Sequence, residues 1–225
     1  MSGNKSFRDG LKRSFPIITG YVPIAMAYGV IGIQSGIPAA VLIAMSIVVY
    51  AGASQFMAVN LFVMGTSPVE MIIAVGILNL RHVVMGLSFQ SKVRFNKKDR
   101  LISSLGLTDE TFAILSMEDG LNASYTKGVM LGSYLSWVLG TVAGILFGNI
   151  LPAILSQGLE IAIYTLFITL LVSSLKISAK MFYVPLVSMT SNYIISQYVS
   201  SGLAILISIL IGAFAGTIGG GDDHE

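Results

Sequence analysis

Long apolar runs divide the chain into segments of about the length that crosses a lipid bilayer. A membrane-spanning helix needs about 20 mostly apolar residues, each rising ~1.5 Å. Seven segments reach or approach this length, at 15–33, 38–64, 68–90, 128–151, 158–175, 181–199 and 203–219. The polar stretches between them are too short to form a separate soluble domain. We therefore predict an all-α polytopic membrane protein in which residues 1–225 form one integral membrane domain.

The lysine and arginine clusters predict how these segments cross the membrane. Basic residues gather in the N-terminal residues 1–14, in the loop 91–103, and at Lys176 and Lys180. Short loops rich in lysine and arginine favour the cytoplasm, so we expect all three sites there. An even number of crossings must then separate each pair of sites. Three apolar segments lie between residues 14 and 91, so one of them is expected not to cross.

The segment 38–64 is the best candidate for the incomplete crossing. It is longer than one untilted span, and small and polar residues at its centre, the sequence AGASQF at Ala51–Phe56, allow a break. Broken backbone at membrane depth is tolerated only where it is buried in protein or lines a water-filled cavity. We predict about six full crossings plus this broken or re-entrant element, which should face a polar path. Both termini, including the acidic tail 220–225, are then cytoplasmic.

Glycine placement predicts close packing of helices. Glycines recur every fourth residue at Gly140, Gly144 and Gly148, and again at Gly212 and Gly216. Such small faces let membrane helices approach one another, and we favour this interpretation over a ligand site. A faint similarity between residues 21–38 and 134–152 suggests a weak internal repeat, a feature of many transporters.

Composition narrows the class of protein. Of the 225 residues, 54% are apolar and 11% are charged, against about 25% charged in an average soluble domain. This composition argues against a soluble enzyme and a disordered chain. A net charge of +2 gives no strong field for nucleic acid. With no cysteine and two histidines, cysteine chemistry and a multi-histidine metal site are excluded, and we expect no cofactor.

Arg81 is the one charged residue inside an apolar run. It lies ~20 Å along a helix about 34 Å long. A charge near the bilayer centre costs about 2.5–3.5 kcal/mol, and arginine does not escape by deprotonation. Two interpretations remain open. The side chain either reaches the cytoplasmic edge beside Lys92 and Arg94, or it is an internal cation that pairs with an acid or holds a substrate carboxylate.

Polar residues near Arg81 in the sequence are further candidates for the site. Asn79 and His82 share one helix face, and His82 is either a structural histidine or a group that binds or relays a proton. Ser54, Gln55 and Asn60 offer neutral hydrogen bonds to a polar ligand, although each of them would also serve to join helices.

The sequence TDET at Thr108–Thr111 offers a partner for Arg81. Thr108 is a helix N-cap residue and Thr111 stands at the N3 position. Asp109 and Glu110 then lie in the first turn of the helix, where acids are favourable. Either this is only the start of an interfacial helix, or one of the two acids enters the edge of the membrane and pairs with Arg81.

The order and spacing of AGASQF, NLRH at Asn79–His82 and TDET resemble the AzlC-like branched-chain amino acid permease family. The resemblance extends over nearly the whole chain, from the opening FRDGLKRSFPIITGYVPIAMAYG onwards, and departs from the family at Ser54, where alanine is common. It implies export of valine, leucine and isoleucine, with methionine as a further candidate. It also implies a prokaryotic inner membrane and a small hydrophobic AzlD-like partner subunit.

A secondary transporter is therefore the leading hypothesis. An amino acid is a zwitterion, so Arg81, Gln55 and the broken helix ends would meet its carboxylate, and Asp109 or Glu110 its ammonium group. One alternative is a non-transporting scaffold or channel subunit. A less favoured one is an intramembrane enzyme, for which His82 and Ser88 would be the candidate pair, but no GxSxG, HExxH or nucleotide-binding P-loop occurs.

Overall fold

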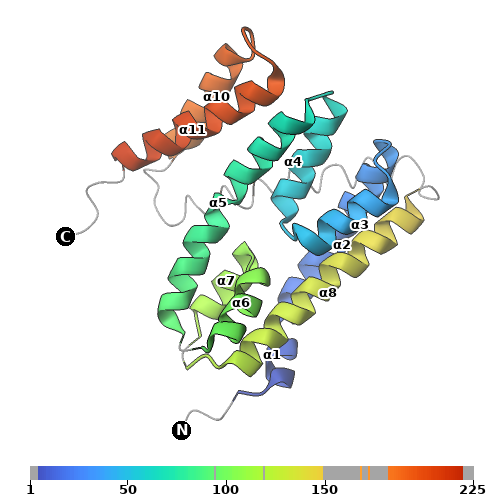
Figure 1. The fold of residues 1–225 in the computed structure, drawn as a ribbon, viewed down its shortest axis with the longest axis vertical. Helices are drawn as coiled ribbons and strands as arrows, with labels where there is room; N and C mark the ends of the chain where they lie inside the picture. Colours follow the sequence, from blue (N-terminus) through green and yellow to red (C-terminus); the bar gives the residue numbers. More distant parts are fainter. Residues whose placement is uncertain are drawn as a thin grey trace. The chain divides into compact units, whose positions relative to one another are not determined.

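The computed structural model describes residues 5–93, 95–118, 120–148, 168, 172 and 182–219. In these residues every regular element is an α-helix, which confirms the all-α prediction (Figure 1). The predicted segment 158–175, apart from residues 168 and 172, lies outside the described residues. So do Lys176, Lys180, the tail 220–225, and the last part of the suggested repeat at 134–152.

The helices follow one another along the chain and fall into two compact units. They are α1 (Phe7–Arg13), α2 (Phe15–Gln34), α3 (Ala39–Val48), α4 (Gly52–Val63), α5 (Pro68–Lys92), α6 (Lys97–Leu105), α7 (Asp109–Ser116), α8 (Ala123–Phe147), α10 (Tyr183–Ile195) and α11 (Ser201–Gly219). Unit 1 comprises Met1–Phe56 and Asn79–Ala162, and unit 2 comprises Met57–Leu78 and Ile163–Glu225. Helices α4 and α5 each contribute residues to both units.

Three of the helices in the described residues, α2, α5 and α8, are long and apolar enough to cross a membrane. They correspond to the predicted segments 15–33, 68–90 and 128–151. Helix α10 has 13 residues, ~20 Å, so it is shorter than the predicted segment 181–199. The difference has a local cause, because backbone N–H groups from Ser196 to Val199 close turns on the carbonyls of the last helical turn instead of extending the helix.

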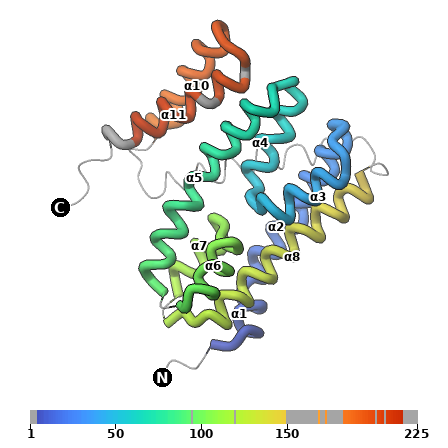
Figure 2. The backbone as a smooth tube through the Cα atoms, viewed as in Figure 1, coloured from blue at the N-terminus to red at the C-terminus, as the bar shows by residue number. Residues whose placement is uncertain are grey.

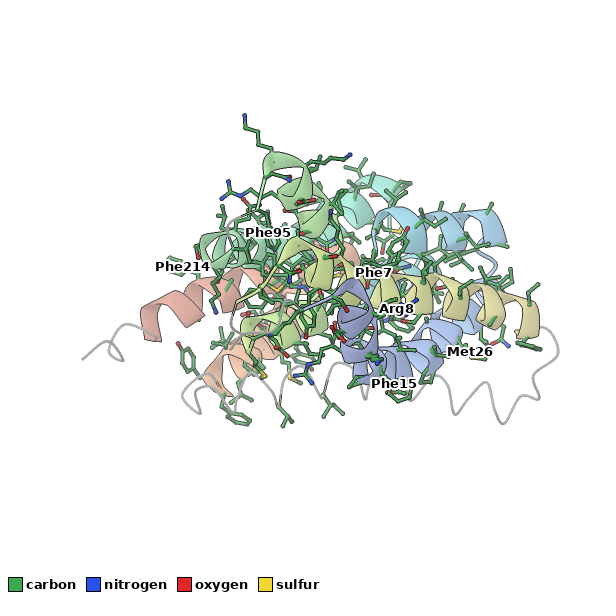
Figure 3. All side chains as sticks on the ribbon, turned by 90° about the horizontal axis from the view of Figure 1, so that it is seen from below. Phe7, Arg8, Phe15, Met26, Phe95 and Phe214 are labelled. Carbon is green, nitrogen blue, oxygen red and sulfur yellow. The ribbon has the colours of Figure 1, made fainter. Side chains whose placement is uncertain are left out.

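Unit 1 is built on the close packing of α2 along α8 (Figure 2). The predicted glycine stripe of α8 faces α2. A Cβ atom added to Gly140 would lie 2.8 Å from Cβ of Ala25, and one added to Gly144 would overlap the backbone of Met26, which Figure 3 labels on α2. The packing role predicted for these glycines is therefore confirmed, since a larger side chain would separate the two helices.

Helices α1 and α6 pack against the first turns of α8. A Cβ atom on Gly128 would overlap the backbone of Phe7, and one on Gly106 would lie 2.8 Å from Cβ of Met130. The polar N-terminus and the loop 91–103 are thus partly helical, each beginning at a side-chain N-cap. Both basic segments therefore lie at the same end of unit 1.

Ion pairs hold these segments at that end. Lys5 Nζ lies 2.5 Å and Arg13 Nε 3.0 Å from the carboxylate of Glu118, and Lys127 pairs with Asp99. Because Lys5 donates a hydrogen bond to it, the pKa of Glu118 is lowered. Glu118, which lies between α7 and α8, therefore ties the N-terminal segment to this end of unit 1.

The predicted break in the segment 38–64 is confirmed. Helix α3 ends at Val48 and α4 begins at Gly52. The N–H of Tyr50 bonds the carbonyl of Met45, and Tyr50 then takes the left-handed conformation with φ of 44°. The interruption lies at residues 49–51, so Ser54 and Gln55 stand inside the first turn of α4 and not in the break itself.

Unit 2 has a small apolar core. Leu61 and Ala74 are buried, and Met57, Met71, Ile77 and Ile205 pack against them. Ser200 donates a hydrogen bond of 3.0 Å to Glu70. A Cβ atom on Gly212 would overlap Oγ of Ser188, so α10 and α11 approach closely at this glycine, as its spacing predicted.

Candidate functional site

Arg81 and Asp109 form an ion pair in unit 1. Nη1 of Arg81, on α5, lies 2.8 Å from Oδ2 of Asp109, in the first turn of α7. Their side chains are 27% and 31% exposed, so the pair is only partly shielded from its surroundings. Nε of Arg81 is buried and has no hydrogen-bond partner among the described residues. The structure therefore shows the pairing with an acid that the second interpretation of Arg81 predicts.

A capping box fixes the direction of this acid. Oγ1 of Thr108 accepts from the N–H of Thr111 at 3.3 Å, and Oγ1 of Thr111 accepts from the N–H of Thr108 at 2.7 Å. Both threonines are buried. The N-cap predicted from TDET is confirmed, and it starts α7 so that Asp109 and Glu110 stand at the positive end of the helix dipole.

The second acid of TDET is held by a tyrosine. The hydroxyl of Tyr21 donates to Oε2 of Glu110 at 2.5 Å and lies 2.7 Å from Oγ1 of Thr108. The ring of Tyr21 also meets Trp137 edge to face, with centroids 5.1 Å apart. No salt bridge to Glu110 occurs among the described residues. The sequence analysis missed Tyr21, whose only signal was a hydroxyl-bearing ring inside the first apolar run.

Gln55 is the centre of a buried network that joins three helices. Its amide donates to Oγ of Ser46 at 2.9 Å and accepts from Nε1 of Trp137 at 2.8 Å. Oγ of Ser46 in turn lies 2.8 Å from Oγ1 of Thr141. Since both ends of the Gln55 amide are occupied by the protein, this residue connects α3, α4 and α8.

Ser54 and Asn79 bond to each other. Oγ of Ser54 donates to Oδ1 of Asn79 at 2.5 Å, which ties α4 to α5 within unit 1. His82 is half-buried and lies within electrostatic range of Arg81 and both acids of TDET. Asn60 is exposed and belongs to unit 2. The structure thus assembles seven of the eight predicted site residues in unit 1, and Asn60 does not belong to this group.

Tyr50 stands beside this group at the α3–α4 break. It is 5% exposed, its ring meets that of Tyr134 edge to face at 4.9 Å, its hydroxyl lies beside that of Tyr21, and it is within electrostatic range of Glu110. Its ring also lines an apolar pocket of about 650 Å³ together with Ile47, Val48, Met130, Leu131 and others. Tyr50 therefore connects a polar cluster to an apolar pocket, a role that the sequence analysis did not assign.

Comparison with known proteins identifies the family. Residues 16–151 match the model of the AzlC protein family. An uncharacterised membrane protein of Archaeoglobus fulgidus is 36% identical over 78% of this chain and 79% of its own. The inner membrane protein YgaZ of Escherichia coli is 32% identical over 65% of this chain and 63% of its own.

The branched-chain amino acid transport protein AzlC of Bacillus subtilis is 29% identical over 74% of this chain and 67% of its own. No solved structure matches the chain. The family match covers α2 to α8, which includes the Arg81–Asp109 pair, the capping box and the broken element. This chain is a membrane protein that belongs to the AzlC family.

Proposed function

We propose that the chain is a secondary transporter that exports branched-chain and related hydrophobic amino acids. The observation that carries this proposal is the arrangement of Arg81, Asp109 and Glu110. A cation with one unpartnered donor is paired with Asp109, and Glu110 follows in the same helix turn, in a region of apolar helices. The name of the B. subtilis relative supports the same class of substrate.

The substrate carboxylate binds Arg81. Nη1 is engaged by Asp109, whereas the buried Nε is free to donate within the described structure. Nε and a terminal nitrogen form the edge of a guanidinium group that grips a carboxylate through two parallel hydrogen bonds. A substrate that takes this edge satisfies the Nε donor, which offsets the cost of dehydrating its own carboxylate.

The substrate ammonium group binds the acidic side of the cluster. Asp109 and Glu110 carry two negative charges and Arg81 carries one positive charge, so the three groups together favour an additional cation. When a zwitterion binds across these three groups, its ammonium group pairs with the uncompensated carboxylate and its own carboxylate binds the arginine. The hydrophobic side chain then enters apolar surroundings, and this selects valine, leucine, isoleucine and methionine over polar amino acids.

The proposal also covers the location, orientation and partner of the protein. We propose one integral domain in a prokaryotic inner membrane with both termini in the cytoplasm, working with a small hydrophobic AzlD-like subunit. The common location of the two basic sites at one end of unit 1 supports the orientation. The name of the E. coli relative, an inner membrane protein, supports the location.

Efflux from reconstituted vesicles tests this function. Vesicles that contain the purified chain, with and without the small subunit, are loaded with labelled valine, leucine, isoleucine or methionine. Labelled lysine and glutamate serve as controls for selectivity. We expect saturable efflux of the four hydrophobic amino acids and none of the charged ones. The absence of efflux with the complex, or equal efflux of all six, would show that the substrate assignment is wrong.

A further inference from the structure

Tyr50 adopts a backbone conformation that few side chains tolerate. It is the only non-glycine residue with positive φ in the described part of the chain. The left-handed region is unfavourable for a bulky side chain, and residues held there concentrate at functional sites. Glycine would adopt this conformation without strain. The turn alone therefore does not explain why this position carries a tyrosine.

The hydroxyl of Tyr50 is buried next to the hydroxyl of Tyr21, which donates its own proton to Glu110. It makes no hydrogen bond of standard geometry with any described residue, although the side chain is only 5% exposed. Other tyrosines in unit 1 show the usual pattern, since Tyr134 donates to the carbonyl of Ile47 at 2.9 Å and Tyr21 donates to Glu110. Because the Tyr21 proton goes to Glu110, the Tyr21 hydroxyl can only accept from Tyr50, and the oxygen of Tyr50 receives no donor from the described residues. Buried polar groups are nearly always bonded, so we expect an additional donor there.

The surroundings of Tyr50 define the charge of that partner. Tyr21 of α2 and Glu110 of α7 lie within electrostatic range of its hydroxyl. Asp109 of α7 is neutralised by Arg81 of α5, and His82 of α5 also faces the two acids. Glu110 has no ion-pair partner in the described residues, and Lys127, which lines the pocket beside Tyr50, is paired with Asp99, so the uncompensated charge near Tyr50 is negative. A cationic donor fits there, whereas a carboxylate would be repelled.

We propose that Glu110 and Tyr50 together bind the ammonium group of the transported amino acid. This inference rests on the proposed function and identifies the acceptors within it. An ammonium group has three donors and no acceptor. The Glu110 carboxylate supplies the charge, the Tyr50 hydroxyl oxygen accepts a second hydrogen bond, and Tyr21 positions the carboxylate. The apolar pocket beside the Tyr50 ring offers the nearby hydrophobic surface for the aliphatic side chain.

The substitution Tyr50→Phe tests the site because it removes only the hydroxyl. The Tyr50 hydroxyl makes no hydrogen bond of standard geometry, so the melting temperature of the substrate-free protein should change little. Loss of a hydrogen bond to a charged group should raise KM for leucine about tenfold. It should also reduce the increase in melting temperature that leucine produces. The matched control is Tyr28→Phe, which removes a buried hydroxyl bonded to the carbonyl of Leu42 and should leave KM unchanged.

A competition experiment on the unmodified protein tests the same inference without a substitution. The 2-oxo acid of leucine keeps the carboxylate and the isobutyl group but lacks the ammonium group. It should compete with leucine at least tenfold more weakly than leucine itself. Equal competition, or a wild-type KM in Tyr50→Phe together with wild-type efflux, would overturn the ammonium site and leave the proposed transport function standing. If the wild-type protein shows neither leucine efflux nor a leucine-dependent melting shift, both proposals are wrong.

Discussion

Single side chains explain how this apolar chain accommodates the charge of Arg81. Arginine cannot lose its proton, so Arg81 must be compensated by geometry. Its partner Asp109 comes from a helix start 28 positions later. The sequence led to this pair because a lone charge in an apolar run requires a partner and TDET offered two acids. It could not choose between them, since the choice depends on where the capping box directs each carboxylate.

The ion pair predicts different effects for two conservative substitutions. Arg81→Lys keeps the charge but loses the planar two-donor edge, so we expect leucine KM to rise about tenfold with protein still present in the membrane. Asp109→Asn leaves the cation without its counter-charge and should cost about 1–3 kcal/mol of stability as well as transport. Vesicle efflux and melting temperature in detergent separate the two effects. Arg8→Ala, on the exposed face of α1, is the control.

The Gln55 network predicts a structural role for that residue. Gln55→Leu leaves the indole N–H of Trp137 without its acceptor and should destabilise the protein by about 1–3 kcal/mol. Asn60→Leu, at an exposed position, should change stability by less than about 0.5 kcal/mol. Thermal unfolding of both variants in detergent checks this. Unchanged stability in Gln55→Leu would show that the network does not hold the three helices.

Glu118 predicts a pH dependence of stability. Its folded-state pKa is lowered by the hydrogen bond from Lys5, so its contribution is present above the unfolded pKa and is lost as the pH falls through the folded pKa. Glu118→Gln should lower stability by about 1 kcal/mol or less at neutral pH. The difference from wild type should narrow in acid. Melting curves at a series of pH values test this, and a difference that grows in acid would contradict it.

At the level of whole helices, the sequence predicted which helices exist better than it predicted where each one begins and ends. Apolar length and glycine spacing identify α2, α5 and α8. Bilayer thickness sets the number of apolar residues that a span needs, and close packing of helices requires small residues, so both leave a direct trace in the sequence. Counting the crossings predicted that this segment is broken, but it did not place the break at residues 49–51. The left-handed residue there is Tyr50 and not the glycine that usually marks such a conformation. The short helices α1 and α6 were missed, since their stability comes from caps and from packing on α8.

The glycine stripe predicts where helix α8 tolerates a side chain. Gly144→Ala would place a methyl group against the backbone of Met26, which cannot move aside easily, and should cost about 1–3 kcal/mol. Gly20→Ala on α2 meets no atom within 4 Å and should stabilise the protein by up to about 1 kcal/mol. Melting temperatures of the two variants provide the test. An equal effect of both would mean that α2 and α8 are not in close contact.

For the whole molecule, the threading through the membrane is the main prediction. The chain has no cysteine, so one introduced cysteine can be labelled without background. Asn96→Cys is expected to react with a membrane-impermeant reagent only after the cell is opened, because its loop is proposed to be cytoplasmic. A cysteine at Lys5 should behave identically, since both sites lie at one end of unit 1. Labelling of either site in intact cells would reverse the proposed orientation.

The central claim is that this chain moves hydrophobic amino acids through a site organised by Arg81. The most direct test compares leucine efflux from vesicles that contain equal amounts of wild type or Arg81→Ala, each with the small subunit. We predict saturable leucine efflux for wild type and a rate at the level of empty vesicles for Arg81→Ala. Wild-type efflux in the folded Arg81→Ala protein would contradict the account, because the carboxylate would then bind elsewhere.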